Sequence, residues 1–233
     1  MTKNMLRKFG PYFKPGIAGL LAGFIVFYGF IHFRAAQLND DFQQAQDAAK
    51  ERLNLVAQVL SQSLNTRLHH TRSLAAFVKA NPNFTEQEFT IYANALQENL
   101  KGLRSLQLAP NGVVHYVTNL QQNRAALGHD LFADTKRRAL VEQAVKDRRY
   151  VIAGPINLIQ GGTAIIARRP IFLPNPSGSG DTFWGFATVL IDVAPLLAES
   201  GFLNLRHDMA LTIRGKDGRG AAGDIFYGTA QTA

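Results

Sequence analysis

Residues 151–172 read VIAGPINLIQGGTAIIARRPIF and carry the clearest signal of the fold. Two runs of mainly aliphatic and β-branched residues, 156–159 and 164–172, flank the pair Gly161-Gly162. Such runs on either side of a glycine pair predict two antiparallel strands joined by a tight turn. The sequence therefore predicts a β-hairpin in this segment.

The flanking sequence extends the hairpin into a larger sheet. Pro110-Asn111-Gly112 is a turn sequence between two strand-like runs. Further strands are expected over residues 103–108, 113–118, 183–191, 209–214 and 225–227. Helices are expected between the hairpins, one from a cap at Asp134 to Arg149 and a short one after a cap at Asp192. Hairpins with helices between them indicate the α+β class with an antiparallel sheet.

Two adjacent arginines lie on one of the predicted strands. Arg168 and Arg169 follow an aliphatic run, and neighbouring strand residues face opposite ways, so one of them is expected to point inward. An inward guanidinium could bind an anionic ligand through two hydrogen bonds. A structural ion pair with Asp192 or Asp130 is an equally good interpretation.

A long helix is predicted ahead of the sheet, because residues 35–80 contain no proline or glycine. Apolar residues recur there at spacings of three and four: Phe42, Ala45, Ala49, Leu53, Val56, Leu60, Leu64 and Leu68. This stripe fits a stalk that forms a coiled-coil dimer, or a helix that packs on its own domain. Thr85 and Glu88 then form a capping-box sequence that begins a second helix.

The N-terminal part of the chain has the pattern of a membrane anchor. Residues 15–33 carry no formal charge and as a helix would be about 28 Å long, close to the ~30 Å of a hydrocarbon core. The bases in residues 1–14 predict a cytoplasmic N-terminus and an exported remainder. A cleaved signal peptide is the alternative, but Arg34 interrupts the small residues that a cleavage site requires.

Composition excludes several functional classes. The chain of 233 residues is 46% hydrophobic and has no cysteine, which excludes disordered proteins, disulfide scaffolds and thiolate metal sites. Five bases around the anchor account for more than half of the net charge of +8 and leave +3 on residues 35–233. We therefore expect no nucleic-acid partner.

The sequence contains no recognisable catalytic motif. The zinc-protease pattern His-Glu-x-x-His and the nucleophile-elbow pattern Gly-x-Ser-x-Gly are both absent. His69 and His70 point about 100° apart on a helix, so they are expected to be solvated rather than metal ligands. Residues 215–220 are glycine-rich but lack the phosphate-loop spacing, so we expect a turn. No catalytic residue, metal or cofactor is predicted, and the chain is expected not to be an enzyme.

Several segments together resemble the CHASE domain, the extracytoplasmic sensor of bacterial and plant membrane receptors. The resemblance covers about residues 75–200. It rests on the order and spacing of LQLAPNGVV (106–114), ALGHDL (126–131), VIAGPINLIQGG (151–162), RPIF (169–172) and the strand ending in Ile191-Asp192-Val193.

The resemblance implies a domain layout. It implies a stalk helix over 35–80, a membrane-distal PAS-like ligand-binding subdomain over 81–191, and an incomplete proximal subdomain over 192–233. It also implies a homodimer in the membrane, a second membrane helix, and a cytoplasmic histidine kinase or diguanylate cyclase. Those last two elements are absent from the chain, which we therefore expect to be a fragment or a truncated product.

The resemblance also bears on the ligand. Plant members bind cytokinins through a threonine on the central strand, and Arg168 occupies the matching position here. A polar or anionic small molecule is therefore expected. From strand position, the pocket is expected to be lined by Gln107, His115, Tyr116, Thr118, Pro155, Thr163, Arg168, Phe186 and Thr188. The alternatives to a sensor are a membrane-tethered exported hydrolase and a dimeric scaffold.

Overall fold

A computed structural model describes residues 10–158, 161–175, 177–178, 180–205 and 209–228. The chain divides into two compact units, residues 1–54 and 55–233, which are treated separately below. Most of the predicted basic tail over residues 1–14 lies outside the described residues, as do His207 and residues 229–233.

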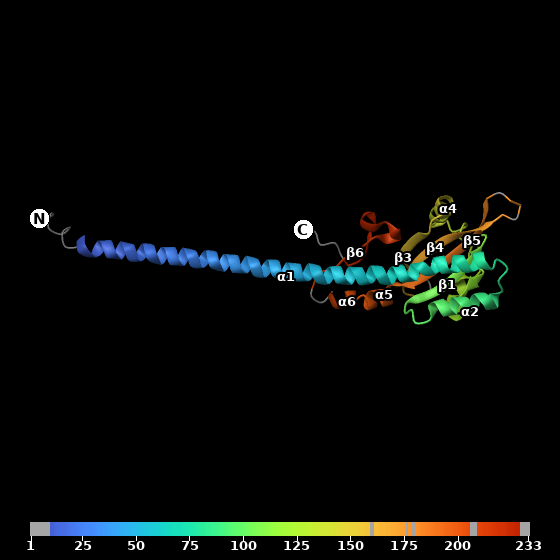
Figure 1. Cartoon of the computed structure of the whole chain (residues 1–233), viewed down its shortest axis with the longest axis horizontal. Coiled ribbons are helices and arrows are strands. Elements are labelled where there is room, and N and C mark those ends of the chain that lie inside the picture. Colours follow the sequence, from blue (N-terminus) through green and yellow to red (C-terminus); the bar gives the residue numbers. More distant parts are fainter. Residues whose placement is uncertain (1–9, 159–160, 176, 179, 206–208, 229–233) are drawn as a thin grey trace. The chain divides into compact units, whose positions relative to one another are not determined.

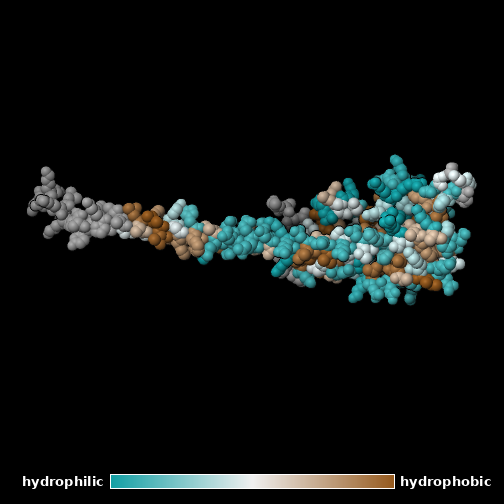
Figure 2. Space-filling view, viewed as in Figure 1, coloured by the Kyte–Doolittle hydropathy of each residue, from teal (hydrophilic) through white to brown (hydrophobic). Residues whose placement is uncertain are grey.

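The first unit is helical throughout its described part. It contains the N-terminal portion of α1 (Gly10–Ala80), which begins without an acidic residue in its first turn. By length and composition, one segment of the described helix is apolar enough to cross a membrane. Phe24, Ile25 and Val26 each expose more than two thirds of their surface, as expected for side chains that face lipid. Figure 2 shows a hydrophobic, brown band on the described N-terminal part of α1.

The second unit contains a five-stranded antiparallel sheet of order β2-β1-β5-β4-β3 (Figure 1). Its strands are β1 (Leu103–Pro110), β2 (Tyr116–Val117), β3 (Val151–Asn157), β4 (Thr163–Pro174) and β5 (Asp181–Asp192). The β3–β4 hairpin and the long β5 confirm the strands expected from the sequence. The return strand expected over 113–118 is shorter, because Val113 instead forms a bridge with Asp130.

One face of the sheet packs against α1 and α2 (Glu86–Gln97). The core there contains Leu74 and Val78 from α1, Phe89 from α2, and Leu106 and Val189 from the sheet. In Figure 1, α1 crosses this face and α2 runs alongside. Both hydrogen bonds of the predicted capping box are present at the start of α2. Burial of this apolar face is the main stabilising contribution of the two helices.

The stripe on α1 divides at about residue 56. Val56, Leu60 and Leu64 pack against the core, so this part of the stripe packs on its own domain. Phe42 and Leu53, further toward the N-terminus, are exposed.

The other face of the sheet is covered by α4 (Arg138–Asp147) and the segment before it. Val141 and Ala144 of α4 pack with Leu131, Ala109 and Phe186. The chain between β2 and α4 also forms two elements that the sequence did not predict, α3 (Leu120–Asn123) and the 3₁₀ helix η1 (Arg124–Ala126).

A smaller group of elements follows the sheet. They are α5 (Val193–Glu199), α6 (Phe202–Leu205), β6 (Ile213–Arg214), the 3₁₀ helices η2 (Lys216–Gly218) and η3 (Gly220–Ala222), and β7 (Ile225–Tyr227). The predicted strand over 209–214 is therefore confined to its last two residues, and α6 was not predicted.

Two predicted helix caps are wrong. Asp192 precedes α5, but its carboxylate accepts a hydrogen bond from Arg104 at 2.6 Å and makes no cap bond. Asp134 lies four residues before α4, and its carboxylate accepts from the Lys136 amide and the Arg137 guanidinium. In both cases a nearby arginine pairs with the acid that was expected to cap a helix.

A buried arginine fixes α1 to the rest of the second unit. The Arg67 side chain is 1% exposed and donates to the Ser63 and Lys101 carbonyl oxygens and, at 2.6 Å, to Glu199. The Ser63 hydroxyl also donates to Glu199, at 2.9 Å. This network connects the C-terminal part of α1 to the end of α5.

Candidate ligand-binding site

Three polar residues form a straight row across the sheet beneath α4. Gln107 on β1 lies opposite Thr188 on β5, and Thr188 lies opposite Arg168 on β4. Their neighbours Leu106, Ala167 and Val189 belong to the core on the α1 face. Because side chains alternate along a strand, the three polar side chains lie on the α4 face. All three are buried, with Arg168 only 5% exposed.

Arg168 and Thr188 have unpaired polar atoms. Among the described residues, neither Nε of Arg168 nor Oγ1 of Thr188 has a hydrogen-bond partner, although both atoms are buried. Nearly all buried polar groups in proteins are hydrogen-bonded, and an unpaired buried charge is particularly costly. This pair therefore marks a position where an external acceptor would be stabilised.

The electrostatic surroundings of Arg168 come from the segment that leads into α4. The pKa of Arg168 is lowered to about 10, first by burial and then by the Arg137 guanidinium, while Asp134 partly offsets both. Burial disfavours the charged form of Asp134, but Arg137, the Lys136 amide and His129 outweigh it and lower the pKa of this carboxyl. His129 Nε2 lies 3.6 Å from the Asp134 carboxylate. Arg168 in the row and Arg137 beside it carry two positive charges, and Asp134 carries one negative charge, so the local environment is net positive.

Apolar and small polar groups surround the row. Phe186 is fully buried two residues before Thr188, and its ring centroid lies 5.1 Å from that of Phe183. Gln107 donates a long hydrogen bond of 3.4 Å to the Ser105 hydroxyl, which faces the same side of β1. Ser105 was not predicted, although its position two residues before Gln107 places it on the same strand face.

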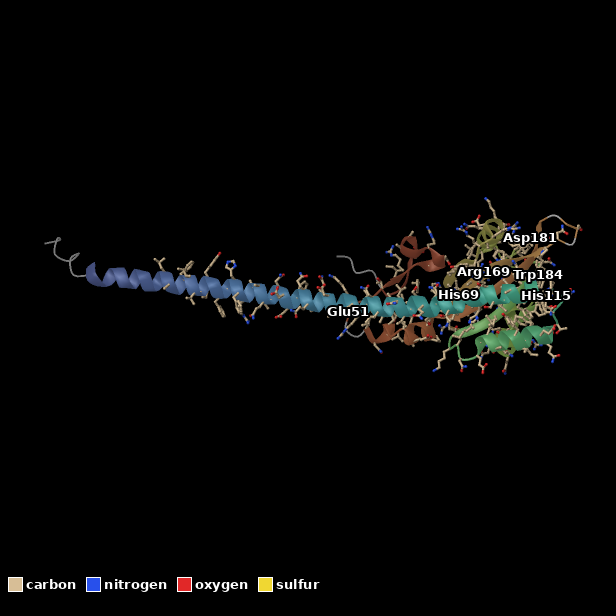
Figure 3. The ribbon with its side chains drawn as sticks, in the orientation of Figure 1. Glu51, His69, His115, Arg169, Asp181 and Trp184 are labelled. Atoms are coloured by element: carbon tan, nitrogen blue, oxygen red, sulfur yellow. The ribbon has the colours of Figure 1, made fainter. Side chains whose placement is uncertain are left out.

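Of the nine predicted pocket residues, Gln107, Arg168, Phe186 and Thr188 share this face, and the other five lie elsewhere. His115 is exposed near the turn after β1 (Figure 3), and Tyr116 packs between Phe84 and Phe89 on the α1 face. Thr118 Oγ1 accepts a hydrogen bond from the Leu106 amide. Thr163 donates to Asn157 within the β3–β4 hairpin. Pro155 lines a separate cavity of about 290 Å³ with Leu60, Leu64 and Leu197.

The second arginine of the pair lies on the opposite face. Arg169 is beside α1 in Figure 3, where its Nε donates to Thr71 Oγ1 at 3.3 Å. The expected partners of an inward arginine are engaged elsewhere, since Asp192 pairs with Arg104 and Asp130 accepts from the Phe132 amide. The interpretation of Arg168 as half of an ion pair with either acid is therefore wrong.

The histidine pair on α1 differs from its prediction. His69 is exposed as expected, but both ring nitrogens of His70 are buried and have no partner among the described residues. Burial, followed by the nearby charges of His69 and Arg67, lowers the pKa of His70 and favours the neutral ring. No cluster of three or more potential metal ligands occurs in the part of the chain that the structure describes.

The comparison with protein families decides the identity of this domain. The model of the CHASE domain matches residues 110–227, which is half of the chain. The chain belongs to the CHASE domain family. This match confirms the resemblance expected from the sequence, and it covers β2 to β7 and all the residues of the row except Gln107. CHASE domains are sensors, and this chain is accordingly a sensor domain of the extracytoplasmic type.

Solved structures with the same architecture are also sensor domains. The sensor domain of the V. cholerae histidine kinase DctB aligns with a TM-score of 0.50 and 11% identity, over 69% of this chain and 60% of that one. This likeness extends to the fold alone and agrees with the predicted α+β, PAS-like class. A search of curated proteins found no match.

Two further structures align less closely. The ligand-binding domain of the Pseudomonas aeruginosa PAO1 chemoreceptor PctC, in complex with GABA, has a TM-score of 0.47 and 15% identity, covering 68% of this CHASE chain and 65% of its own. An extracellular ligand-binding receptor from Desulfohalobium retbaense has a TM-score of 0.48 and 13% identity, covering 63% and 26%. The CHASE chain spans less than two thirds of each of these three structures.

Proposed function

We propose that this CHASE sensor binds a small polar or anionic molecule between the Gln107–Thr188–Arg168 row and α4. The observation that carries the proposal is the pair of unpaired polar atoms, Arg168 Nε and Thr188 Oγ1, on one buried face. A guanidinium in a poorly solvated site binds carboxylate or phosphate oxygens strongly, because the ligand replaces the lost hydration.

The local charge balance favours a ligand of low charge. Arg168 and Arg137 supply two positive charges, and Asp134 supplies one negative charge. A single carboxylate on the ligand would neutralise the remaining positive charge. Thr188 would donate a hydrogen bond to the ligand, and Gln107 would contact a polar substituent on it. Phe186 would contact the apolar part of the same molecule.

Signal transfer is proposed to pass through the sheet to α1. β4 and β5 carry the polar row on one face and the α1-facing core on the other, so a ligand that moves these strands repacks α1. The exposed Phe42 and Leu53 would pair two stalks in a homodimer, with the N-terminus in the cytoplasm. The signal would then reach a kinase or cyclase output domain outside this chain.

A ligand screen tests the binding step. The full chain in nanodiscs of neutral lipid would be screened by thermal shift against small organic acids and other polar metabolites. We expect at least one compound to raise the melting temperature, and the shift to disappear in Arg168→Met. Arg138→Met is the matched control, because Arg138 is exposed and Glu142 is its one ion-pair partner among the described residues. A hit that survives in Arg168→Met would contradict the proposed site.

A fusion experiment tests the orientation. Alkaline phosphatase fused after Ala233 should be active if the domain is exported, because the enzyme matures only in an oxidising compartment. An inactive fusion at normal expression levels would place the domain in the cytoplasm and overturn the proposed topology.

A further inference from the structure

A second region rich in arginine lies along the free edge of the sheet. β3 is an outer strand of the sheet, and a cleft of about 910 Å³ follows it between α4 and η2. Figure 2 shows hydrophilic side chains gathered over α4, beside this edge. The cleft does not contain Arg168, Thr188 or Gln107, so it is distinct from the proposed sensor pocket.

Four arginines line the cleft, and only one of them has an acidic partner. Arg148 pairs with Asp181 at 3.0 Å and lies over the Phe172 ring. Arg149, Arg169 and Arg219 form no ion pair with a carboxylate among the described residues.

The two acids in the cleft are engaged by neutral groups. Asp217 accepts a hydrogen bond of 2.6 Å from the Gly154 amide. Asp147 accepts a longer bond of 3.4 Å from Gln143. The cleft therefore has positive charge that its own acids do not pair with directly.

Arg169 is held in place within this cleft. Its guanidinium carbon lies 5.2 Å from the centre of the Tyr150 ring, and Thr71 fixes its Nε. Burial lowers the pKa of Arg169, which indicates a guanidinium that is partly withdrawn from water. A fixed, partly desolvated guanidinium binds oxyanions more strongly than a mobile surface one.

The remaining lining limits the kind of ligand. Leu140, Ala144, Val151 and Ile152 provide an apolar floor, and the side chain of Tyr150 is 44% exposed. Arg149 precedes β3, whereas Arg219 follows η2, so these two of the three unpaired arginines come from different walls of the cleft. Neutralising both positive charges takes two negative charges, which favours a ligand with more than one acid group.

We infer that this cleft is a second binding site, for a small organic polyanion that is either a polycarboxylate or a phosphate-bearing molecule. Its charged groups lie on Arg149, Arg169 and Arg219, and its carbon framework lies on the apolar floor. The site takes ligands of higher charge than the buried row, where the charges of Arg168, Arg137 and Asp134 together match a single acid group.

Calorimetric titration of the full chain in nanodiscs of neutral lipid tests this site, with citrate and inorganic triphosphate as the two probes. We expect saturable binding of at least one probe, and at least a tenfold rise in its Kd in the double variant Arg149→Gln/Arg219→Gln. The matched control is Arg124→Gln/Arg214→Gln, which removes the same charge at two exposed arginines outside the cleft and should change the Kd less than threefold.

The two probes distinguish the source of the negative charge. Tighter binding of citrate indicates a polycarboxylate ligand, and tighter binding of triphosphate indicates a phosphate-bearing one. Arg168→Met should leave the binding of both probes unchanged, which separates this site from the sensor pocket. Equal losses in the two double variants, loss of binding in Arg168→Met, or no binding of either probe to the unmodified chain would each overturn the inference.

Discussion

Arg67 and Arg168 are both almost completely buried arginines, but their surroundings differ in every other respect. Arg67 donates to two carbonyl oxygens, a hydroxyl and the Glu199 carboxylate. Arg168 Nε has no hydrogen-bond partner among the described residues, and Asp134, which raises the pKa of Arg168, is shared with Arg137. A buried charge with every donor satisfied holds the structure together, whereas one without partners destabilises it unless a ligand supplies them.

The largest effect is expected from Arg67→Met. This change removes the charged partner of Glu199, which keeps only the Ser63 hydroxyl as a donor among the described residues, and removes the Arg67 donors to the Lys101 carbonyl. It should lower the free energy of unfolding by roughly 3 kcal/mol. Urea unfolding followed by circular dichroism of the sheet would measure it. A loss below about 1 kcal/mol would show that the network is not a structural anchor.

Arg168→Met is expected to act in the opposite direction. Removing an unpaired buried charge should raise the free energy of unfolding by roughly 1–2 kcal/mol in the absence of ligand. The same urea experiment measures this gain, and the thermal-shift screen measures the loss of ligand response. Destabilisation comparable to that of Arg67→Met would remove the contrast between the two arginines.

Thr118 and Thr188 also differ in whether their side chains have a partner, and smaller changes in stability are expected for them than for the two arginines. Thr118→Val removes the acceptor of the buried Leu106 amide and should cost about 1–2 kcal/mol. Thr188→Val removes a hydroxyl whose oxygen is unpaired, so it should be neutral or slightly stabilising. Equal losses in the two variants would mean that Thr188 has a structural partner.

The smallest expected effect is the pH dependence of the stability that Glu199 contributes. Burial opposes ionisation of Glu199, but Arg67 and Ser63 outweigh it and lower the pKa of this carboxyl below its usual 4.5. A depressed pKa adds stability that is present above the unfolded-state pKa and is lost as pH falls through the folded-state pKa.

The stability difference between the unmodified chain and Glu199→Gln should therefore be constant near neutral pH and shrink below about pH 4.5. Melting temperatures of both proteins from pH 7 to pH 3 would measure it. A difference that grows on acidification would contradict the assigned direction.

The sequence predicted most of the sheet but less of what covers it. Local signals encode the hairpins, because glycine-containing turns and β-branched runs need no information from elsewhere in the chain. The helix start at Asp134 was predicted wrongly, because the Asp134 carboxylate pairs with Arg137 three residues along the chain, and the sequence pattern alone does not show which local contact this acid makes. The capping box at Thr85 was predicted correctly because both partners lie within one turn of helix.

Only part of the candidate site could likewise be predicted from the sequence. Strand alternation predicted that Arg168 or Arg169 would face inward, but only the register between strands places Thr188 and Gln107 in line with Arg168. Thr163 precedes Arg168 by five residues on β4, so strand alternation places it on the other face, and Pro155 lies in the irregular part of β3 between Ala153 and Ile156. The Arg67 network was missed, although Ser63, Arg67 and Thr71 recur every four residues beside the apolar stripe and could have signalled a buried polar face.

The contact between Asp217 and the Gly154 amide also affects how copies of this domain behave at high concentration. An open outer strand offers free amides to the strand of a neighbouring molecule, and such pairing is a common route to aggregation. Here a carboxylate occupies one of these amides on β3, and the opposite outer strand, β2, is only two residues long. Both borders of the sheet are thus poor templates for another chain, which would help keep a domain crowded at a membrane surface from polymerising through its strands.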